Sequence, residues 1–279
     1  MNISEALISA AKTLQLSEVA ESVREAKSLL AFALNVNQTF LIAHSEQELS
    51  AEEERRFQGF TARRARREPF HYIVGRKEFY NLDFVVTKDV LIPRPETELI
   101  VETALEILKD GGRFCEVGTG SGCISISILH TLQMTSAIGL DISETALSVA
   151  RENAETHRVA ERLELKTSDV YKNLQDEKFD LIVSNPPYIP QRDVKTLQAE
   201  VRDYEPLAAL TDGADGLSIV RRIIDDAPHF LKAGGFLLME IGINQDVAVR
   251  KMFDEKIWRE SDILPDLQNI PRTVKAQIR

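Results

Sequence analysis

From about residue 90 onward, short apolar runs alternate with longer segments of helical periodicity. The apolar runs are candidate strands, and they cover Arg113–Val117, Ala137–Ile142, Leu163–Ser168, Phe179–Ser184, Gly235–Ile241, Trp258–Leu264 and Thr273–Ile278. Strands that alternate with helices build a parallel sheet, because each right-handed crossover helix carries the chain back across one face of it. The alternation therefore predicts an α/β fold with a doubly wound, mostly parallel sheet of these seven strands.

One connecting segment has an ambiguous pattern. Ile124, Ile126 and Ile128 alternate with serines at the period of a strand. The segment follows a strand and a glycine loop, where a parallel sheet requires a crossover element. Position in the fold therefore favours a helix over the local propensity.

The first part of the chain contains helical patterns only. Asn2 with Glu5, and Ser50 with Glu53, have the spacing of capping boxes at helix starts. Ser17 is a further predicted N-cap, because the apolar residues that follow it recur at steps of four and three. These signals predict a compact helical unit.

A change of period follows this helical part. Pro69 is expected to end the last helix. Apolar residues then alternate with polar ones, which predicts a short hairpin over Phe79, Leu82, Phe84 and Val86. The predicted domains are a helical N-terminal substrate-docking domain at 1–72, a hairpin linker at 73–90, and the sheet domain at 91–279.

Charge and composition limit the possible partners. The chain has 34 Lys and Arg against 44 Asp and Glu, a net charge of −10, which would repel a nucleic-acid backbone. No apolar stretch is long enough to cross a bilayer and no leader-like segment begins the chain, so a cytoplasmic protein without membrane contact is expected. Cys115 and Cys123 are too few for a disulfide framework or a zinc site, which predicts two reduced, buried thiols and no metal.

A glycine-rich loop, Glu116–Gly122, follows the first predicted strand of the sheet. Its glycines allow a sharp turn and the approach of a ligand to the main chain, where a side chain would obstruct it. The candidate cofactor-binding residues of this loop are Gly118, Thr119, Gly120, Ser121 and Gly122. A nucleotide-type cofactor is the favoured interpretation, and a tight turn that needs glycine for its own geometry is the alternative.

Two acidic residues mark the ends of the next strands. Asp141 lies about 20 residues beyond the glycine loop, where a carboxylate can accept hydrogen bonds from both hydroxyls of a ribose. With Ser143 beside it, a helix cap is the alternative. Asp169 is placed to accept a hydrogen bond from the exocyclic amine of an adenine, unless it is a turn aspartate. Because the loop lacks the Gly-x-Gly-x-x-Gly spacing, a dehydrogenase is disfavoured.

The fourth strand runs into Asn185-Pro186-Pro187-Tyr188. Ligands bind outside the carboxyl ends of such strands, so this tetrapeptide is expected to face the same crevice as the glycine loop. The Asn185 side-chain carbonyl and the Pro186 main-chain carbonyl can accept both hydrogens of a planar amino group, and Tyr188 offers a ring for stacking. Such a grip favours alkylation of the nitrogen; the alternative is a proline-rich turn.

These motifs together resemble the class I S-adenosylmethionine-dependent methyltransferases that act on planar nitrogens. Further stretches are similar to the protein-(glutamine-N5) methyltransferase family that modifies peptide chain release factors: Tyr72–Gly75, Val90–Glu98, Glu200–Pro206 and Gly213–Leu217. The resemblance covers essentially the whole chain. It implies a Rossmann-like sheet, S-adenosyl-L-methionine as cofactor, and methylation of the glutamine in the Gly-Gly-Gln motif of a release factor.

The resemblance also implies roles for individual residues. Positions that match Gly118 to Gly122, Asp141, Val170 and Asn185 contact the cofactor in that family, and positions that match Asn185 to Tyr188 hold the glutamine amide. Relatives often carry an aromatic residue at the position of Val170, and Tyr171 is the candidate to replace it against the adenine.

The stretch Pro93-Arg94-Pro95 is expected near the cofactor, and the alternative is a plain helix entry. Glu96 and Glu98 would lie in the first turn of the helix that follows, where its dipole favours them. Glu240, at the tip of the fifth strand, is a weaker candidate that is not assigned to the site.

Two other functions remain open at this point. An adenine-N6 methyltransferase acting on nucleic acid would use the same acceptor pair, but it needs a basic channel to bind phosphates. A non-catalytic S-adenosylmethionine-binding module on a translation factor is the second.

The basic cluster of Arg63, Arg64, Arg66 and Arg67 is either a solvated helix face or a docking surface for the release factor. The protein is expected to be a monomer without direct nucleic-acid contact.

Overall fold

The computed structural model describes all residues from 1 to 279. By its internal contacts the chain divides into two units: the helical unit, Met1–Arg76 with Gln198–Tyr204, and the sheet unit, Lys77–Leu197 with Glu205–Arg279. The chain therefore leaves the sheet unit after Leu197, adds a short helix to the helical unit, and returns at Glu205.

The sheet unit contains the predicted seven-stranded sheet, in the order β5-β4-β3-β6-β7-β9-β8. Its strands are β3 (Gly112–Val117), β4 (Thr135–Asp141), β5 (Leu163–Thr167), β6 (Phe179–Ser184), β7 (Leu231–Glu240), β8 (Trp258–Pro265) and β9 (Pro271–Ile278). β9 runs antiparallel to both of its neighbours, and the other pairings are parallel. The fold class expected from the strand and helix pattern is confirmed.

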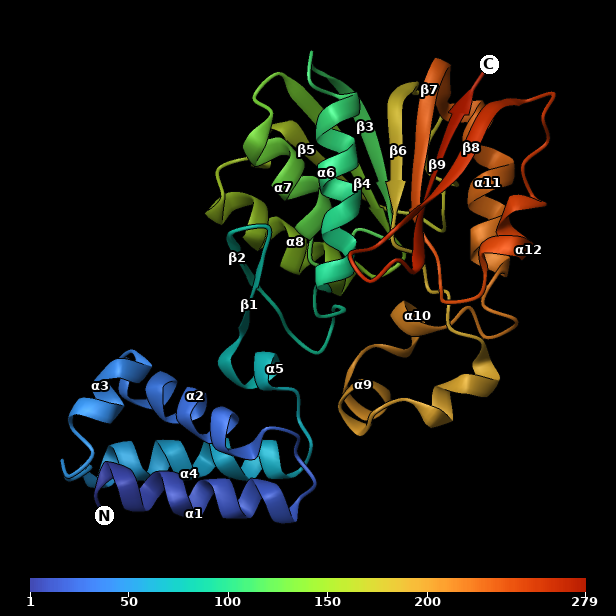
Figure 1. The fold of residues 1–279 in the computed structure, drawn as a ribbon. Helices are drawn as coiled ribbons and strands as arrows, with labels where there is room; N and C mark the ends of the chain where they lie inside the picture. The colour runs from blue at the N-terminus through green and yellow to red at the C-terminus, as the bar shows by residue number, and fades with distance from the viewer. The chain divides into compact units, whose positions relative to one another are not determined.

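Helices cover both faces of this sheet, as Figure 1 shows. One face carries α6 (Glu98–Ile107), α7 (Cys123–Thr131) and α8 (Glu144–Thr156), and the other carries α11 (Ser218–Phe230) and α12 (Asp246–Arg250). The two faces are packed by separate apolar clusters, since alternate residues of each strand point to opposite sides: Phe114 packs with α6 and α7, and Cys115 packs with α11. The segment with alternating isoleucines is the helix α7, as its position predicts.

Short elements complete the sheet unit: η1 (Pro95–Thr97), η2 (Ala160–Arg162), η3 (Gln191–Thr196) and α10 (Leu207–Leu210). The predicted hairpin is present as β1 (Arg76–Phe79) and β2 (Leu82–Val85). Phe79 and Phe84 are fully buried in the cluster that also contains α6. No helix in the chain combines the length and the apolar character that a bilayer crossing requires.

The helical unit consists of α1 (Ile3–Leu16), α2 (Ser22–Leu34), α3 (Gln38–Ala43), α4 (Ala51–Ala65), α5 (Phe70–Val74) and the added helix α9 (Ala199–Tyr204). Both predicted capping boxes are confirmed, at the starts of α1 and α4. The apolar faces of α1, α2 and α4 pack together in one core that includes Leu14, Leu29, Leu30 and Phe57.

Two details of this unit differ from the prediction. Ser17 is the C-cap of α1 and not an N-cap, because its hydroxyl donates back to the carbonyl of Thr13. The next helix begins only at Ser22, after Glu21 in the left-handed conformation. Pro69 does not end α4, which stops at Ala65; it is the N-cap of α5.

The basic cluster at the C-terminal end of α4 is largely neutralised within the helical unit. Arg64 is buried, and its guanidinium bonds both Glu25 and Glu200; Arg67 bonds Glu200 at 2.8 and 2.7 Å. Partial burial acts to raise the pKa of Glu200, but the hydrogen bonds from the two arginines lower it to about 2. Arg63 pairs with Glu68, and only the exposed Arg66 makes no ion pair. Arg64 and Arg67 therefore hold α9 on the helical unit.

Candidate active site

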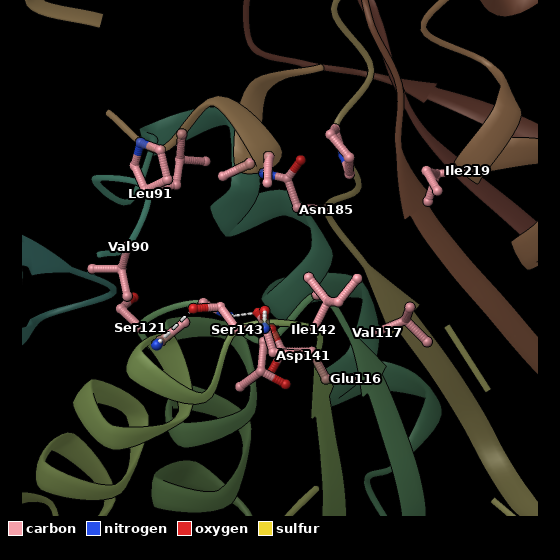
Figure 2. A pocket seen from close by; sticks show the side chains of 18 of the residues that line it. Val90, Leu91, Glu116, Val117, Ser121, Asp141, Ile142, Ser143, Asn185 and Ile219 are labelled. Atoms are coloured by element: carbon pink, nitrogen blue, oxygen red, sulfur yellow. Dashed lines mark hydrogen bonds between the residues drawn. The ribbon is translucent and has the colours of Figure 1, made fainter. Parts of the chain in front are cut away.

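A cavity of about 380 Å³ lies at the carboxyl ends of the central strands. β3 has β4 on one side and β6 on the other, with Val117 in register with both Leu140 and Ser184. The residues that follow these strands therefore meet at one edge: the glycine loop after β3, Asp141 at the end of β4, and Asn185 after β6. Figure 2 shows Glu116 and Asp141 at the strand ends, with Asn185 above them.

The glycine loop adopts the conformations that its glycines were expected to permit. Gly118, Gly120 and Gly122 all have positive φ, at 77°, 55° and 81°. A Cβ on Gly118 would lie 3.7 Å from the Asn185 carbonyl oxygen, and one on Gly122 only 2.8 Å from Ile126 Cδ1. A Cβ on Gly120 would meet nothing within 4 Å, so the loop is open at this residue. Glycine thus serves both the turn and the access to the cavity.

Asp141 connects the loop to the start of α8. Its carboxylate accepts hydrogen bonds from the backbone N–H of Gly120 at 2.8 Å and of Ser143 at 2.9 Å. Ser143 is indeed the N-cap of α8, but Asp141 lies before the cap and lines the cavity. Burial raises the pKa of Asp141, and the backbone hydrogen bonds offset part of this rise. A carboxylate has about four acceptor directions, so two remain for a ligand.

A fully buried asparagine that sequence reasoning missed supports the same loop. Asn153 of α8 donates to the Ser121 carbonyl at 2.9 Å, and it exchanges two hydrogen bonds with the backbone of Val85 in β2. Asn153 and Ser121 are 32 residues apart, so no local sequence pattern indicates that they form a hydrogen bond.

Glu116 ends inside the cavity wall as a buried carboxyl group. It accepts a hydrogen bond from the Ser125 backbone N–H at 3.1 Å, near the start of α7. Burial raises the pKa of Glu116 to about 8 despite that bond. In the ligand-free protein the group is therefore largely protonated at neutral pH.

This raised pKa predicts a pH-dependent stability difference between the wild type and Glu116→Gln. Between the ordinary pKa of 4.5 and about 8, the folded protein keeps a proton that the unfolded chain has lost. The wild-type free energy of unfolding should therefore fall relative to the variant as pH rises, by about 1.4 kcal/mol per pH unit. Urea unfolding of both ligand-free proteins at several pH values across this window checks it. Parallel pH profiles for the two proteins would contradict the assignment.

The residues after β5 only partly follow the prediction. Asp169 and Val170 line the cavity, but the Asp169 carboxylate also pairs with Lys172 at 3.0 Å and Arg222 at 2.8 Å, which lower its pKa. Tyr171 does not replace the expected aromatic ring at the cavity: it is buried in the core and stacks on Phe230. Val170 has a positive φ of 54°, an uncommon backbone conformation for a β-branched residue.

The tetrapeptide after β6 contributes two side chains to one hydrogen-bond network. Asn185 Nδ2 donates to Thr97 Oγ1 at 3.0 Å, and that hydroxyl donates to Glu240 Oε2 at 2.6 Å. The Tyr188 hydroxyl donates to the other oxygen of Glu240 at 2.9 Å. Burial raises the pKa of Tyr188, and the negative charge of Glu240 raises it further. The tyrosine is therefore a neutral donor.

Two possible acceptors remain uncommitted beside this network. Neither Asn185 Oδ1 nor the Pro186 carbonyl oxygen accepts a hydrogen bond from the protein. Asn185 and Pro187 line the cavity, whereas Pro186 is buried and Tyr188 lies outside the lining. The Asn185 carbonyl is thus directed away from Thr97, and the Pro186 carbonyl oxygen has no hydrogen-bond donor within the protein.

The backbone beyond Tyr188 is tightly held. Gln245 Nε2 donates to the Tyr188 carbonyl at 2.9 Å, while its Oε1 accepts from the backbone N–H of Gly242. Gly216 passes so close that a Cβ on it would lie 2.3 Å from the Tyr188 carbonyl oxygen. The stretch Gly213–Leu217, which is similar to the glutamine methyltransferase family, therefore packs against this loop.

The stretch Pro93-Arg94-Pro95 is predicted to lie near the cofactor, and its first two residues line the cavity. Arg94 pairs with the buried Glu205 at 2.5 Å, and Glu205 also accepts from the Ile92 backbone N–H. Glu98 lies in the first turn of α6, where it accepts from the Tyr80 backbone N–H. Cys123, expected to be buried, is half-buried in the cavity wall.

The structure thus brings most predicted site residues to one cavity. Those in its lining are Gly118, Thr119, Gly120, Ser121, Asp141, Asp169, Val170, Asn185 and Pro187. Gly122, Pro186 and Tyr188 are not part of the lining. Thr97 and Gln245 were not singled out from the sequence, and Glu240 was passed over.

Solved structures of similar fold include a methyltransferase from Pyrococcus furiosus, with a TM-score of 0.55 and 16% identity, covering 78% of this chain and 98% of the other. The hMettl16 catalytic domain, solved in complex with a MAT2A 3′UTR hairpin, has a TM-score of 0.59 and 16% identity, with 81% of each chain covered. At such identities the likeness concerns the fold alone.

Sequence comparisons are more specific. Residues 5–75 match the PrmC N-terminal domain, and residues 95–202 match the methyltransferase small domain. A release factor glutamine methyltransferase from Geobacter sulfurreducens is 42% identical over 91% of this chain and 89% of its own length. One from Cereibacter sphaeroides is 40% identical over 100% and 99% of the two chains. With relatives this similar along nearly its whole length, the chain belongs to the release factor glutamine methyltransferase family.

Proposed function

We propose that the protein transfers a methyl group from S-adenosyl-L-methionine to the side-chain amide nitrogen of the glutamine in the Gly-Gly-Gln motif of a peptide chain release factor. The observation that carries this proposal is the pair of uncommitted carbonyl oxygens at Asn185 and Pro186, next to a cavity lined by a glycine loop. The family relatives, which are named for this reaction, support it.

The cavity suits the proposed cofactor. The open backbone at Gly120 admits a ligand, and Asp141 has acceptor capacity left for two ribose hydroxyls. When bound there, S-adenosyl-L-methionine supplies an electrophilic methyl group on a sulfonium sulfur. Asp169 and Val170 would border the adenine, with Asp169 sharing its carboxylate with Lys172 and Arg222.

The acceptor side needs positioning more than acid–base chemistry. An amide nitrogen is a weak nucleophile, so its orientation and the stabilisation of growing positive charge supply most of the barrier reduction. Asn185 Oδ1 and the Pro186 carbonyl would accept the two N–H bonds of the carboxamide and leave its nitrogen free to attack. Once it carried the methyl group that the cofactor would supply, the amide nitrogen would be acidic and would lose one proton to water, so no strong side-chain base is needed. Tyr188, a neutral donor to Glu240, is not the base.

The helical unit is the proposed docking domain for the release factor. Of the four arginines in its basic cluster, Arg66 alone is exposed and makes no ion pair. Charge reversal at Arg64 or Arg67 would break the pairing with Glu200, so Arg66 is the position at which docking is tested. Arg66→Glu should weaken methylation of the intact release factor and leave methylation of a short peptide unchanged.

We further propose that the protein acts as a monomer in the cytoplasm and does not bind nucleic acid. Release factors as substrates support the location, and the net charge of −10 with three neutralised arginines supports the absence of a phosphate-binding surface. Light scattering of the purified protein checks the monomer.

The test of the function is incubation with radiolabelled cofactor and a release factor, followed by mass spectrometry of the labelled peptide. Label should appear on the glutamine of the Gly-Gly-Gln motif and be absent from a Gln→Ala release factor. Label on an added adenine-containing oligonucleotide would favour the adenine-N6 alternative. Cofactor binding without transfer in a single turnover would favour the non-catalytic module.

A further inference from the structure

Thr97, Glu240 and the two polar side chains of the Asn-Pro-Pro-Tyr segment form a network whose members are far apart in sequence. The three hydrogen bonds join residues separated by 88, 143 and 52 positions. Thr97 ends η1, Glu240 ends β7, and the tetrapeptide follows β6. Thr97 and Glu240 are both almost fully buried, at 2% and 1% exposure.

The direction of each hydrogen bond is fixed by chemistry. Burial raises the pKa of Glu240, but the hydrogen bonds from Thr97 and Tyr188 favour its ionised form. An ionised carboxylate only accepts, so the single hydroxyl hydrogen of Thr97 is committed to Glu240. Thr97 then presents only lone pairs toward Asn185, which must turn its NH2 group to the threonine. A flipped amide would place two acceptors against each other in a buried site, at a high cost.

Glu240 serves the second side chain in the same way. Its other oxygen accepts the Tyr188 hydroxyl, so one buried carboxylate fixes both the amide orientation and the ring. The charged groups with electrostatic influence on Glu240 are Arg272 of β9 and Glu96 of η1. Arg272 itself pairs with Asp266 at 3.3 Å, so Glu240 has no dedicated ion-pair partner. A buried carboxylate without such a partner costs stability, which argues for a role in the site.

We propose that Thr97 and Glu240 are positioning residues of the acceptor site, which hold Asn185 with Oδ1 toward the substrate and hold the Tyr188 ring in place. This inference rests on the proposed function, since it assigns a purpose to the free oxygen of Asn185. Neither residue contacts the reacting atoms; both act through the tetrapeptide.

The experiment compares Thr97→Val, which keeps the shape and removes the hydroxyl, with Thr97→Ser, which keeps the hydroxyl. With a Gly-Gly-Gln peptide, Thr97→Val should lower kcat by about tenfold to a hundredfold because the carboxamide is misplaced. The cofactor Kd should stay within about twofold, and Thr97→Ser should retain kcat within about threefold of the wild type. Thr103→Val is the matched control, because this buried threonine of α6 bonds only the Leu99 carbonyl.

A double-mutant cycle separates positioning from a general structural effect. If Thr97 acts through Asn185, then Thr97→Val added to Asn185→Ala should lower kcat by no more than about twofold beyond Asn185→Ala alone. Glu240→Gln should resemble Thr97→Val, and if it fails to fold, the two Thr97 variants carry the test.

The outcomes distinguish this inference from the proposed function. A wild-type protein that methylates neither the peptide nor the glutamine of the intact release factor would overturn the function itself. An active wild type with an equally active Thr97→Val, an impaired Thr97→Ser, or additive effects in the cycle would overturn the positioning role alone.

Discussion

Asn185→Ala should lower kcat for a Gly-Gly-Gln peptide by about a hundredfold to a thousandfold, the range for loss of one group that stabilises transition-state charge. The variant loses Oδ1 of a cavity-lining residue, one of the two carbonyl oxygens that accept no hydrogen bond from the protein, and also the hydrogen bond to Thr97. Because the amide nitrogen gains positive charge as it is methylated, the lost acceptor matters more in the transition state than in the bound substrate. The effect should therefore appear in kcat, as steady-state kinetics can show.

Asn173→Ala provides the matched control for this variant. Asn173 is exposed, does not line the cavity, and bonds the Thr167 carbonyl with its side chain. It should keep wild-type kcat, and thermal unfolding of both variants should stay close to the wild type. An Asn185→Ala protein with a near-normal rate would eliminate the acceptor-pair mechanism.

Asp141→Ala should weaken cofactor binding by at least about a hundredfold, since hydrogen bonds to a charged group are each worth about 1.5–3 kcal/mol. The carboxylate has acceptor capacity for two ribose hydroxyls, and it also orders the loop through the N–H groups of Gly120 and Ser143. Both effects act on the cofactor and not on the carboxamide. At saturating cofactor, kcat should therefore remain within about threefold of the wild type.

Calorimetric titration with S-adenosylhomocysteine measures this change directly. Asp141→Asn, which keeps one acceptor oxygen, should bind with intermediate affinity, and the exposed Asp262→Ala should bind like the wild type. Unchanged affinity of Asp141→Ala would remove the ribose assignment while leaving the acceptor site untouched.

The parts of the site that sequence reasoning anticipated carry local signals. Gly118, Gly120 and Gly122 adopt left-handed backbone conformations that few other residues tolerate, so their spacing is legible in the sequence. Asp141 and Asn185 follow directly from strands, and the order of parallel strands then brings them together. The isoleucines of α7 alternate with serines at the period of a strand, but the position of this segment after the glycine loop correctly predicts a helix.

The parts that were missed depend on long-range pairing. Thr97 and Glu240 lie 143 residues apart, and no local sequence pattern indicates that their side chains form a hydrogen bond. The same holds for Arg64, whose partner Glu200 is 136 residues away. Glu200 belongs to the segment Gln198–Tyr204, which is part of the helical unit although the residues on either side of it belong to the sheet unit. Ser17 shows a different limit, because a hydroxyl can cap the helix on either side and only the backbone course decides which.

The most direct measurement is a crystal structure with S-adenosylhomocysteine and a Gly-Gly-Gln peptide bound. Asn185 Oδ1 and the Pro186 carbonyl oxygen should each lie within about 3.2 Å of the glutamine amide nitrogen, the upper limit of ordinary N–H···O bonds. A glutamine side chain bound elsewhere, or an Asn185 amide rotated so that its NH2 faces the peptide, would contradict the account.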